Sequence, residues 1–184
     1  MNRFFDEAFA ELIKDEGTSY TNHPQDSGGP TKFGVTKNAW EKYVGYEVPN
    51  EVIRDLDLSE AKKFYGSEYW CALSCEKLVK RSVALCIFNT CVLYGHRAAA
   101  KIAQRSAYSI EHPLKFDGIL GDRSIAALNC VNEEDFLKTY HGLILSRIAW
   151  IIEQYPKNEV FRKGWVNRAD RLLALNEADE KDIS

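Results

Sequence analysis

The segment that most constrains the fold is the most apolar part of the chain, residues 79–92, which read VKRSVALCIFNTCV. As a helix, this segment lacks the polar face that a surface helix turns toward water. A helix that is apolar on all sides has to be covered by other elements, so we predict a central buried helix here. Gly95 ends it, and HRAAAKIAQRS, residues 96–106, starts another helix beside it.

The segments before residue 79 also predict helices. Asn2 can cap a first helix that ends at Gly17. Its apolar residues recur at helical spacing: Phe4, Phe5, Ala8, Phe9, Leu12 and Ile13. Thr36 can cap a short helix, and Ser59, with Glu60 in the first turn, starts another.

The C-terminal part continues the helical pattern. Asn132 precedes three acidic residues, 133–135, which favour a helix start because they lie at the positive end of the helix dipole. This helix runs to Pro156, and a last amphipathic helix spans about residues 159–175.

One long polar stretch interrupts the helices: KDEGTSYTNHPQDSGGPTKFGVT, residues 14–36. The credible strands lie here, around residues 19–22 and 32–35, with DSGGP as the turn between them. We therefore predict a mainly α protein, a helical domain with a small β-hairpin.

Charge and hydropathy exclude several classes of protein. The 24 basic and 27 acidic side chains leave a formal charge of −3, which gives no support for nucleic-acid binding. No apolar run approaches the roughly eighteen residues of a membrane span. The N-terminus, MNRFFDEAFAELIKDEG, is acidic where a signal peptide is apolar. We expect synthesis in the cytoplasm with release by another route, or a leader that has been removed.

The cysteines indicate neither a disulfide framework nor a metal site. Their number, five, is odd, and their spacing is loose. Cys71 and Cys75 stand one helical turn apart, which suits zinc, but the spacing of Cys86 and Cys91 and of the histidines does not. We predict buried thiols, no metal and no cofactor.

The polar stretch begins with two adjacent carboxylates, Asp15 and Glu16, at the end of the first helix. The negative end of the helix dipole and the neighbouring Asp15 both disfavour the charged form of Glu16, which suits a general acid. Asp26 and Thr31 follow in the loop and can position a water for attack on a sugar acetal. The alternative is a solvated acidic pair beside an ordinary turn.

A resemblance favours the catalytic interpretation. The pattern Glu16-Gly17, Tyr20, Asn22, Asp26, Gly28-Gly29, Thr31, Gly34-Val35-Thr36 resembles the N-terminal signature of the glycoside hydrolase family 108 lysozymes, which are N-acetylmuramidases of phage and bacteria. FYGSEYW, residues 64–70, is similar to the family's aromatic helix. FDGILGDRSIAALN, residues 116–129, resembles its predicted peptidoglycan-binding half, and FRKGWVNRADRLLAL, residues 161–175, resembles its closing helix.

The resemblance implies a lysozyme-like catalytic region at residues 1–95 and a peptidoglycan-binding region at 96–184, packed as one compact unit. It maps the family's catalytic glutamate onto Glu16. The order of Glu16, Asp26 and Thr31 is similar to the triad of phage-type lysozymes, whose aspartate and threonine handle water. The implied partner is the glycan strand of peptidoglycan, bound by a monomer.

The chain departs from the family pattern at several positions. One residue is inserted between Glu16 and Tyr20. Asn89 stands in place of an acid, and Leu93 in place of a polar amide. These changes predict a preference for a modified glycan, for example one that lacks N-acetyl groups. Ser124 replaces a threonine of the binding pattern.

Further residues are candidates for substrate contact. Four aromatic residues can stack on sugar rings, or they can belong to the core: Tyr20, Phe33, Tyr69 and Trp70. Asn89 can bind a sugar amide, or it can be a buried polar residue satisfied within the core. Arg168 is expected to clamp the last helix to the body of the protein.

Three functions remain open at this point. The first is a muramidase, which cleaves the β-1,4 bond from N-acetylmuramic acid to N-acetylglucosamine. The second is a lytic transglycosylase, which uses Glu16 alone and needs no water. The third is a peptidoglycan-binding protein that has lost catalysis.

Overall fold

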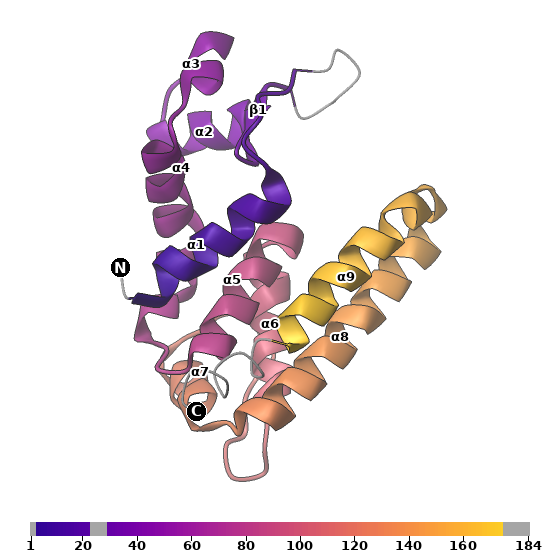
Figure 1. The fold of residues 1–184 in the computed structure, drawn as a ribbon. Coiled ribbons are helices and arrows are strands. Elements are labelled where there is room, and N and C mark those ends of the chain that lie inside the picture. The colour runs from indigo at the N-terminus through magenta and orange to yellow at the C-terminus, as the bar shows by residue number, and fades with distance from the viewer. Residues whose placement is uncertain (1–2, 23–28, 175–184) are drawn as a thin grey trace, which may run out of the picture. The chain divides into compact units, whose positions relative to one another are not determined.

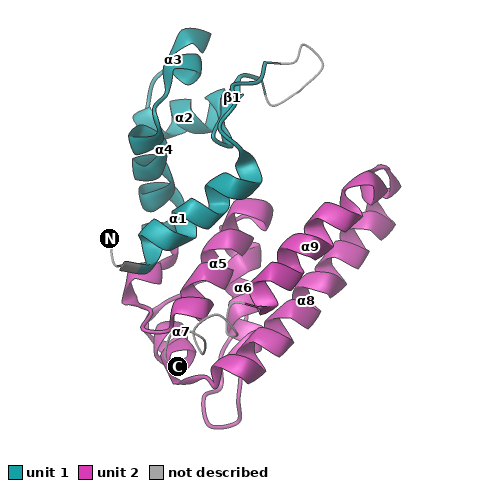
Figure 2. Ribbon diagram, in the orientation of Figure 1, with its two compact units in different colours: residues 1–72 teal, residues 73–184 magenta. Residues whose placement is uncertain are grey.

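The computed structural model describes residues 3–22 and 29–174 (Figure 1). The contacts within the chain group it into two compact units, residues 1–72 and 73–184 (Figure 2). Each unit is described by itself. This division by packing differs from the functional division at residue 95 that the sequence suggests, since it assigns the helix that precedes residue 95 to the second unit.

The described residues of the first unit form four α-helices and a small hairpin. Its elements in chain order are α1 (Arg3–Glu16), β1 (Thr31–Lys32), β2 (Val35–Thr36), α2 (Lys37–Val44), α3 (Asn50–Asp55), α4 (Leu58–Tyr65) and the π-helical turn η1 (Gly66–Trp70). The short 3-10 segment η2 (Cys71–Leu73) crosses the boundary between the units, and η3 (Cys75–Lys77) belongs to the second unit.

The core of the first unit is largely aromatic. Phe5 and Phe9 of α1 pack against Trp70 and Tyr65, with ring centroids 5.4 and 6.0 Å apart respectively. Phe64 lies edge-on to Tyr65 at 5.3 Å. Aromatic side chains bury large areas and pack well in tilted and edge-on pairs, so these rings fix α1 against α4.

The small sheet lies in the predicted polar stretch, but the predicted pairing of residues 19–22 with 32–35 is wrong, since β1 pairs with β2 instead. The pairs Thr31↔Thr36 and Lys32↔Val35 make the segment 32–35 a tight turn, where the sequence pattern predicts a single strand. The segment 19–22 contributes one isolated bridge, between Thr21 and Thr31. Asp26, Ser27 and Gly28 of the predicted DSGGP turn lie outside the described residues.

The second unit is built from helices alone in its described part. Its elements are α5 (Arg81–Tyr94), α6 (His96–Ser106), α7 (Asp122–Cys130), α8 (Glu133–Gln154), the 3-10 segment η4 (Pro156–Phe161) and α9 (Arg162–Leu173). Every residue of α5 from 82 to 91 is buried, which confirms the predicted central helix. α8 and α9 form an antiparallel pair joined by η4 (Figure 1).

Several helix boundaries are set by capping. Thr36 caps α2 as predicted, because its Oγ1 accepts a hydrogen bond from the Ala39 N–H at 3.2 Å. Asn132 caps α8 in the same way. The prediction that Ser59 starts α4 is wrong: Asp57 is the cap, and it forms a reciprocal capping box with Glu60. Asn2, the predicted cap of α1, lies outside the described residues.

Candidate active site

Glu16 is the last residue of α1, and it is half-buried. The helix stops there because Gly17 takes a left-handed conformation, with a φ of 75°, while its N–H still bonds the Ile13 carbonyl at 2.9 Å. The neighbouring Asp15 is exposed. Of the two adjacent carboxylates, Glu16 is therefore the one that is partly enclosed by protein.

The side chain of Glu16 packs directly on the backbone of Gly34. A Cβ added to Gly34 would lie 2.9 Å from Glu16 Oε2 and 3.0 Å from Glu16 Cγ. Gly34 also has a φ of 75°, which a residue with a side chain adopts at a cost. Both the available space and the backbone angle therefore require glycine at this point.

The turn that carries Gly34 has an unusual first residue. Phe33, with a φ of 53°, and Gly34 both lie in the left-handed region, which defines a two-residue type I′ turn. An aromatic residue in this region costs about 1–3 kcal/mol and needs compensating contacts. Tyr65 supplies one, since its buried hydroxyl donates a hydrogen bond to the Phe33 carbonyl at 3.0 Å.

Tyr65 completes the cluster around Glu16. The same Cβ added to Gly34 would lie 2.6 Å from the Tyr65 hydroxyl oxygen. The carboxyl of Glu16, the α-carbon of Gly34 and the hydroxyl of Tyr65 therefore meet at one point in the first unit. Tyr65 is not among the site residues predicted from the sequence, although it lies in the aromatic segment of residues 64–70 that carries part of the family resemblance.

Replacing Tyr65 by Phe tests this cluster. The variant leaves the buried Phe33 carbonyl without its hydroxyl donor, so we expect a loss of about 1–3 kcal/mol in the free energy of unfolding. Activity should also fall severalfold, because the turn beside Glu16 loses its anchor. Chemical denaturation and an activity assay measure the two effects. The control is Tyr43→Phe. The ring of Tyr43 packs on Phe64 with the centroids 5.4 Å apart, and this variant should change neither the free energy of unfolding nor the activity by a comparable amount.

Thr31 and Asp26 are the predicted water-handling residues. Thr31 lies in β1, and its hydroxyl donates a hydrogen bond to the Gly29 carbonyl at 3.1 Å. That bond occupies the donor and leaves the hydroxyl oxygen able to accept from a water. Asp26 lies outside the described residues, so its role stays a prediction.

The four predicted stacking residues occupy different environments. Trp70 is 0% exposed and packs against Phe5, so we assign it to the core rather than to a sugar-binding surface. Phe33 is 8% exposed, with the Lys32 ammonium 5.2 Å from its ring centroid. Tyr20 and Tyr69 are half-buried and keep part of their surface accessible. Their stacking role stays a prediction.

Asn89 lies on α5 in the second unit and is 6% exposed. Its Oδ1 accepts a hydrogen bond from Arg168 Nε at 2.8 Å. Of the two roles left open by the sequence, this contact favours the buried polar residue satisfied within the core. It also confirms that Arg168 clamps α9 to the body of its unit.

The structure gives no support for a metal site or a membrane span. Among the described residues, no group of three or more His, Cys, Asp or Glu side chains is placed to hold a metal ion. In the same part of the chain, no helix is long and apolar enough to cross a membrane. Three cysteines are buried, as predicted, and burial raises the pKa of Cys91 to about 12. For Cys71 and Cys130 the prediction of burial is wrong, since both are exposed.

A mainly helical chain with a glutamate at a helix end, packed against a small hairpin, is the arrangement that the resemblance to a lysozyme-like glycoside hydrolase implies. The comparisons with known proteins agree with this class. Residues 9–95 match the family model "Glycosyl hydrolase 108", and residues 98–170 match "Predicted Peptidoglycan domain". Residues 9–95 are therefore a glycosyl hydrolase 108 domain, and the protein is a glycoside hydrolase that acts on peptidoglycan.

A solved structure has the same fold. It is described as "Structure of Brucella abortus SagA" and aligns with a TM-score of 0.77, covering 95% of this chain and 94% of that chain at 24% sequence identity. At this identity the likeness shows the fold alone. No curated protein matches the chain in sequence.

Proposed function

We propose that the protein is an N-acetylmuramidase that hydrolyses the β-1,4 bond between N-acetylmuramic acid and N-acetylglucosamine, with Glu16 as the general acid. The observation that carries the proposal is the packing of the Glu16 carboxyl against Gly34, 2.9 Å from where a Cβ would lie. A glycine at this contact brings the hairpin backbone as close as possible to the carboxyl. The carboxyl is thereby held in place by the turn of residues 33 and 34.

The reaction assigned to these residues is acid-assisted hydrolysis of an acetal. Glu16 donates its proton to the glycosidic oxygen, which leaves with the electron pair of the bond to the anomeric carbon. Positive charge then develops at that carbon, and a water adds to it. Asp26 accepts a proton of this water, and Thr31 accepts a hydrogen bond that orients it. No cofactor takes part in this scheme.

The proposal also includes the substrate preference and the oligomeric state of the protein. The predicted preference for a modified glycan now depends on Leu93, a half-buried residue of α5, because the amide oxygen of Asn89 is engaged by Arg168. We expect the protein to act on glycan strands as a monomer, and to be bacteriolytic when it reaches the wall.

The chemistry of the product ends tests the proposed bond specificity. Purified sacculi are digested, the fragments are reduced with borohydride, and the ends are identified by mass spectrometry. We expect N-acetylmuramitol ends, since hydrolysis leaves a reducing muramic acid. Ends of the 1,6-anhydro type would assign the protein to the lytic transglycosylases, and N-acetylglucosaminitol ends would show cleavage of the other glycosidic bond. Running native and de-N-acetylated sacculi in parallel measures the glycan preference.

A further inference from the structure

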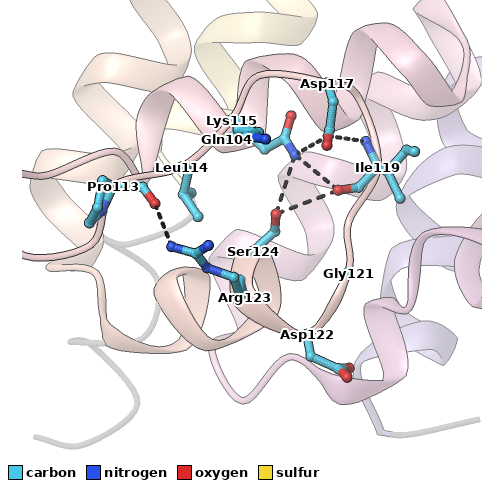
Figure 3. A pocket seen from close by; sticks show the side chains of 10 residues that line it. All are labelled: Gln104, Pro113, Leu114, Lys115, Asp117, Ile119, Gly121, Asp122, Arg123 and Ser124. Atoms are coloured by element: carbon cyan, nitrogen blue, oxygen red, sulfur yellow. Dashed lines mark hydrogen bonds between the residues drawn. The ribbon is translucent and has the colours of Figure 1, made fainter.

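The second unit contains a hollow of about 510 Å³ that the hydrolytic site does not use (Figure 3). It lies between the loop that follows α6 and the first turn of α7. All the residues that line it fall within residues 98–170, the part of the chain that matches the predicted peptidoglycan domain. The hollow is therefore a candidate for the binding function that this domain's name implies.

The wall of the hollow is fixed by one buried amide. Gln104, on α6, is 1% exposed. Its Nε2 shares its two hydrogens among Asp117 Oδ1 at 2.8 Å, the Ile119 carbonyl at 2.9 Å and Ser124 Oγ at 3.2 Å. Its Oε1 accepts from the Gly118 N–H at 3.0 Å. These bonds, most of which Figure 3 draws, tie the loop to α6 and α7.

Gly118 adds a second constraint on the loop. Its φ is 84°, and an added Cβ would lie 2.6 Å from Arg97 Cγ and 3.1 Å from the Arg97 carbonyl oxygen. Together with the Gln104 bonds, this close approach constrains residues 117–119 of the loop. This part of the wall is fixed without a ligand, which lowers the entropic cost of binding.

Two basic and two acidic side chains line the hollow. Lys115 and Arg123 line it, and Arg123 makes a long hydrogen bond of 3.5 Å to the Pro113 carbonyl. Asp117 is bonded to the wall of the hollow, since its Oδ1 accepts from Gln104 and from the Ile119 N–H, and these bonds lower the pKa of its carboxyl. Asp122 pairs with Lys77 at 3.5 Å and points away from the other labelled side chains (Figure 3).

The rest of the lining is aliphatic, from Pro113, Leu114 and Ile119. None of the described residues that line the hollow is aromatic, so it offers no ring for a sugar to stack on. A ligand that fits therefore carries a carboxylate next to short aliphatic groups. In peptidoglycan the peptide stems have this chemistry, whereas the N-acetylated sugars between them are neutral.

We propose that this hollow binds the peptide stem of peptidoglycan, with a stem carboxylate held by Arg123 and Lys115. The aliphatic side chains of the stem lie on Pro113, Leu114 and Ile119. The inference that the ligand belongs to peptidoglycan rests on the proposed function, but binding in the hollow does not require Glu16. It keeps the enzyme on cross-linked wall that still carries stems.

Cosedimentation tests the inference without requiring hydrolysis. Sacculi are coupled to beads through their sugar hydroxyls, part of the beads is then stripped of stems by an amidase, and each sample is incubated in the cold with the Glu16→Gln chain. We expect at least about fivefold stronger retention on intact sacculi, because charge-assisted hydrogen bonds to a stem carboxylate strengthen binding by at least this factor. Arg123→Glu should remove most of this difference. Lys157→Glu, which makes the same change in net charge on η4, should leave it in place.

Each other outcome contradicts the inference. Equal retention on intact and stripped sacculi would mean that the glycan is bound, and unchanged retention of Arg123→Glu would place the site elsewhere. Circular dichroism shows whether this variant is folded. An isotope-labelled chain titrated with the tripeptide L-alanyl-γ-D-glutamyl-diaminopimelate gives a second measurement, with shifts expected at residues 113–124. If wild type releases no fragments yet keeps the preference for stems, the proposed function fails and this inference stands.

Discussion

The Glu16→Gln variant is expected to clear purified sacculi at least about a hundredfold more slowly than the wild-type protein, because the amide cannot donate a proton to the leaving oxygen. Gln keeps the shape of Glu, so its contact with Gly34 is preserved and the change is one of chemistry. The free energy of unfolding should change by less than about 1 kcal/mol, since the side chain is only half-buried. Turbidity loss and chemical denaturation measure the two quantities.

Asp15→Asn is the matched control for this variant. It makes the same chemical change one residue earlier, at an exposed side chain. Its activity should stay within a fewfold of wild type. An equal loss in both variants would indicate that the charge of the helix end matters rather than a specific acid. Full activity in Glu16→Gln would remove Glu16 from the mechanism.

Gly34→Ala is expected to have the second-largest effect, on stability and activity together. The added methyl group would lie 2.6 Å from the Tyr65 hydroxyl and 2.9 Å from Glu16 Oε2, so both side chains have to move. Overpacking of this kind costs about 1–3 kcal/mol, to which the left-handed φ adds about 1 kcal/mol. A displacement of the acid by about 1 Å costs on the order of a hundredfold in rate. Thermal unfolding and the clearing assay measure the losses.

Gly45→Ala separates the two causes. Gly45 ends α2 with a φ of 85°, and an added Cβ there would meet nothing within 4 Å. This variant should lose about 1 kcal/mol of stability from the backbone angle and keep its activity. The Gly34→Ala/Tyr65→Phe double variant should lose less than the sum of the single losses, because Phe removes the closest atom. Strict additivity, or equal effects of Gly34→Ala and Gly45→Ala, would contradict the packing described here.

The parts of the fold that local chemistry specifies are predictable from the sequence. The uniform apolarity of α5 is enough to indicate its burial, and Thr36 and Asn132 cap helices as their residue types suggest. The start of α4 is also readable in the sequence, because Asp57 and Glu60 have the spacing of a capping box. Ser59 is also a good cap residue by type, but it has no Glu or Gln three residues later to complete a capping box.

The hairpin turn is not predictable from residue preferences. DSGGP has the composition of a turn, whereas the observed turn places Phe33 at a φ that disfavours aromatic residues. The bond from Tyr65 to the Phe33 carbonyl joins residues 32 positions apart and offsets part of that cost. Tyr65 is missing from the predicted site for the same reason, because its role depends on a contact with a residue far away in the sequence. Gln104, too, is identifiable as the clamp of its loop only once its distant partners are known.

The most direct test of the central claim, that Glu16 protonates the leaving group, compares two soluble substrates that differ only there. One has a natural sugar as its leaving group, and the other has dinitrophenolate, which departs without protonation. For the natural leaving group, kcat/KM of Glu16→Gln should fall at least about a hundredfold below wild type, and for dinitrophenolate by less than about tenfold. An equal loss on both substrates would contradict the account, because Glu16 would then act on a step other than proton donation.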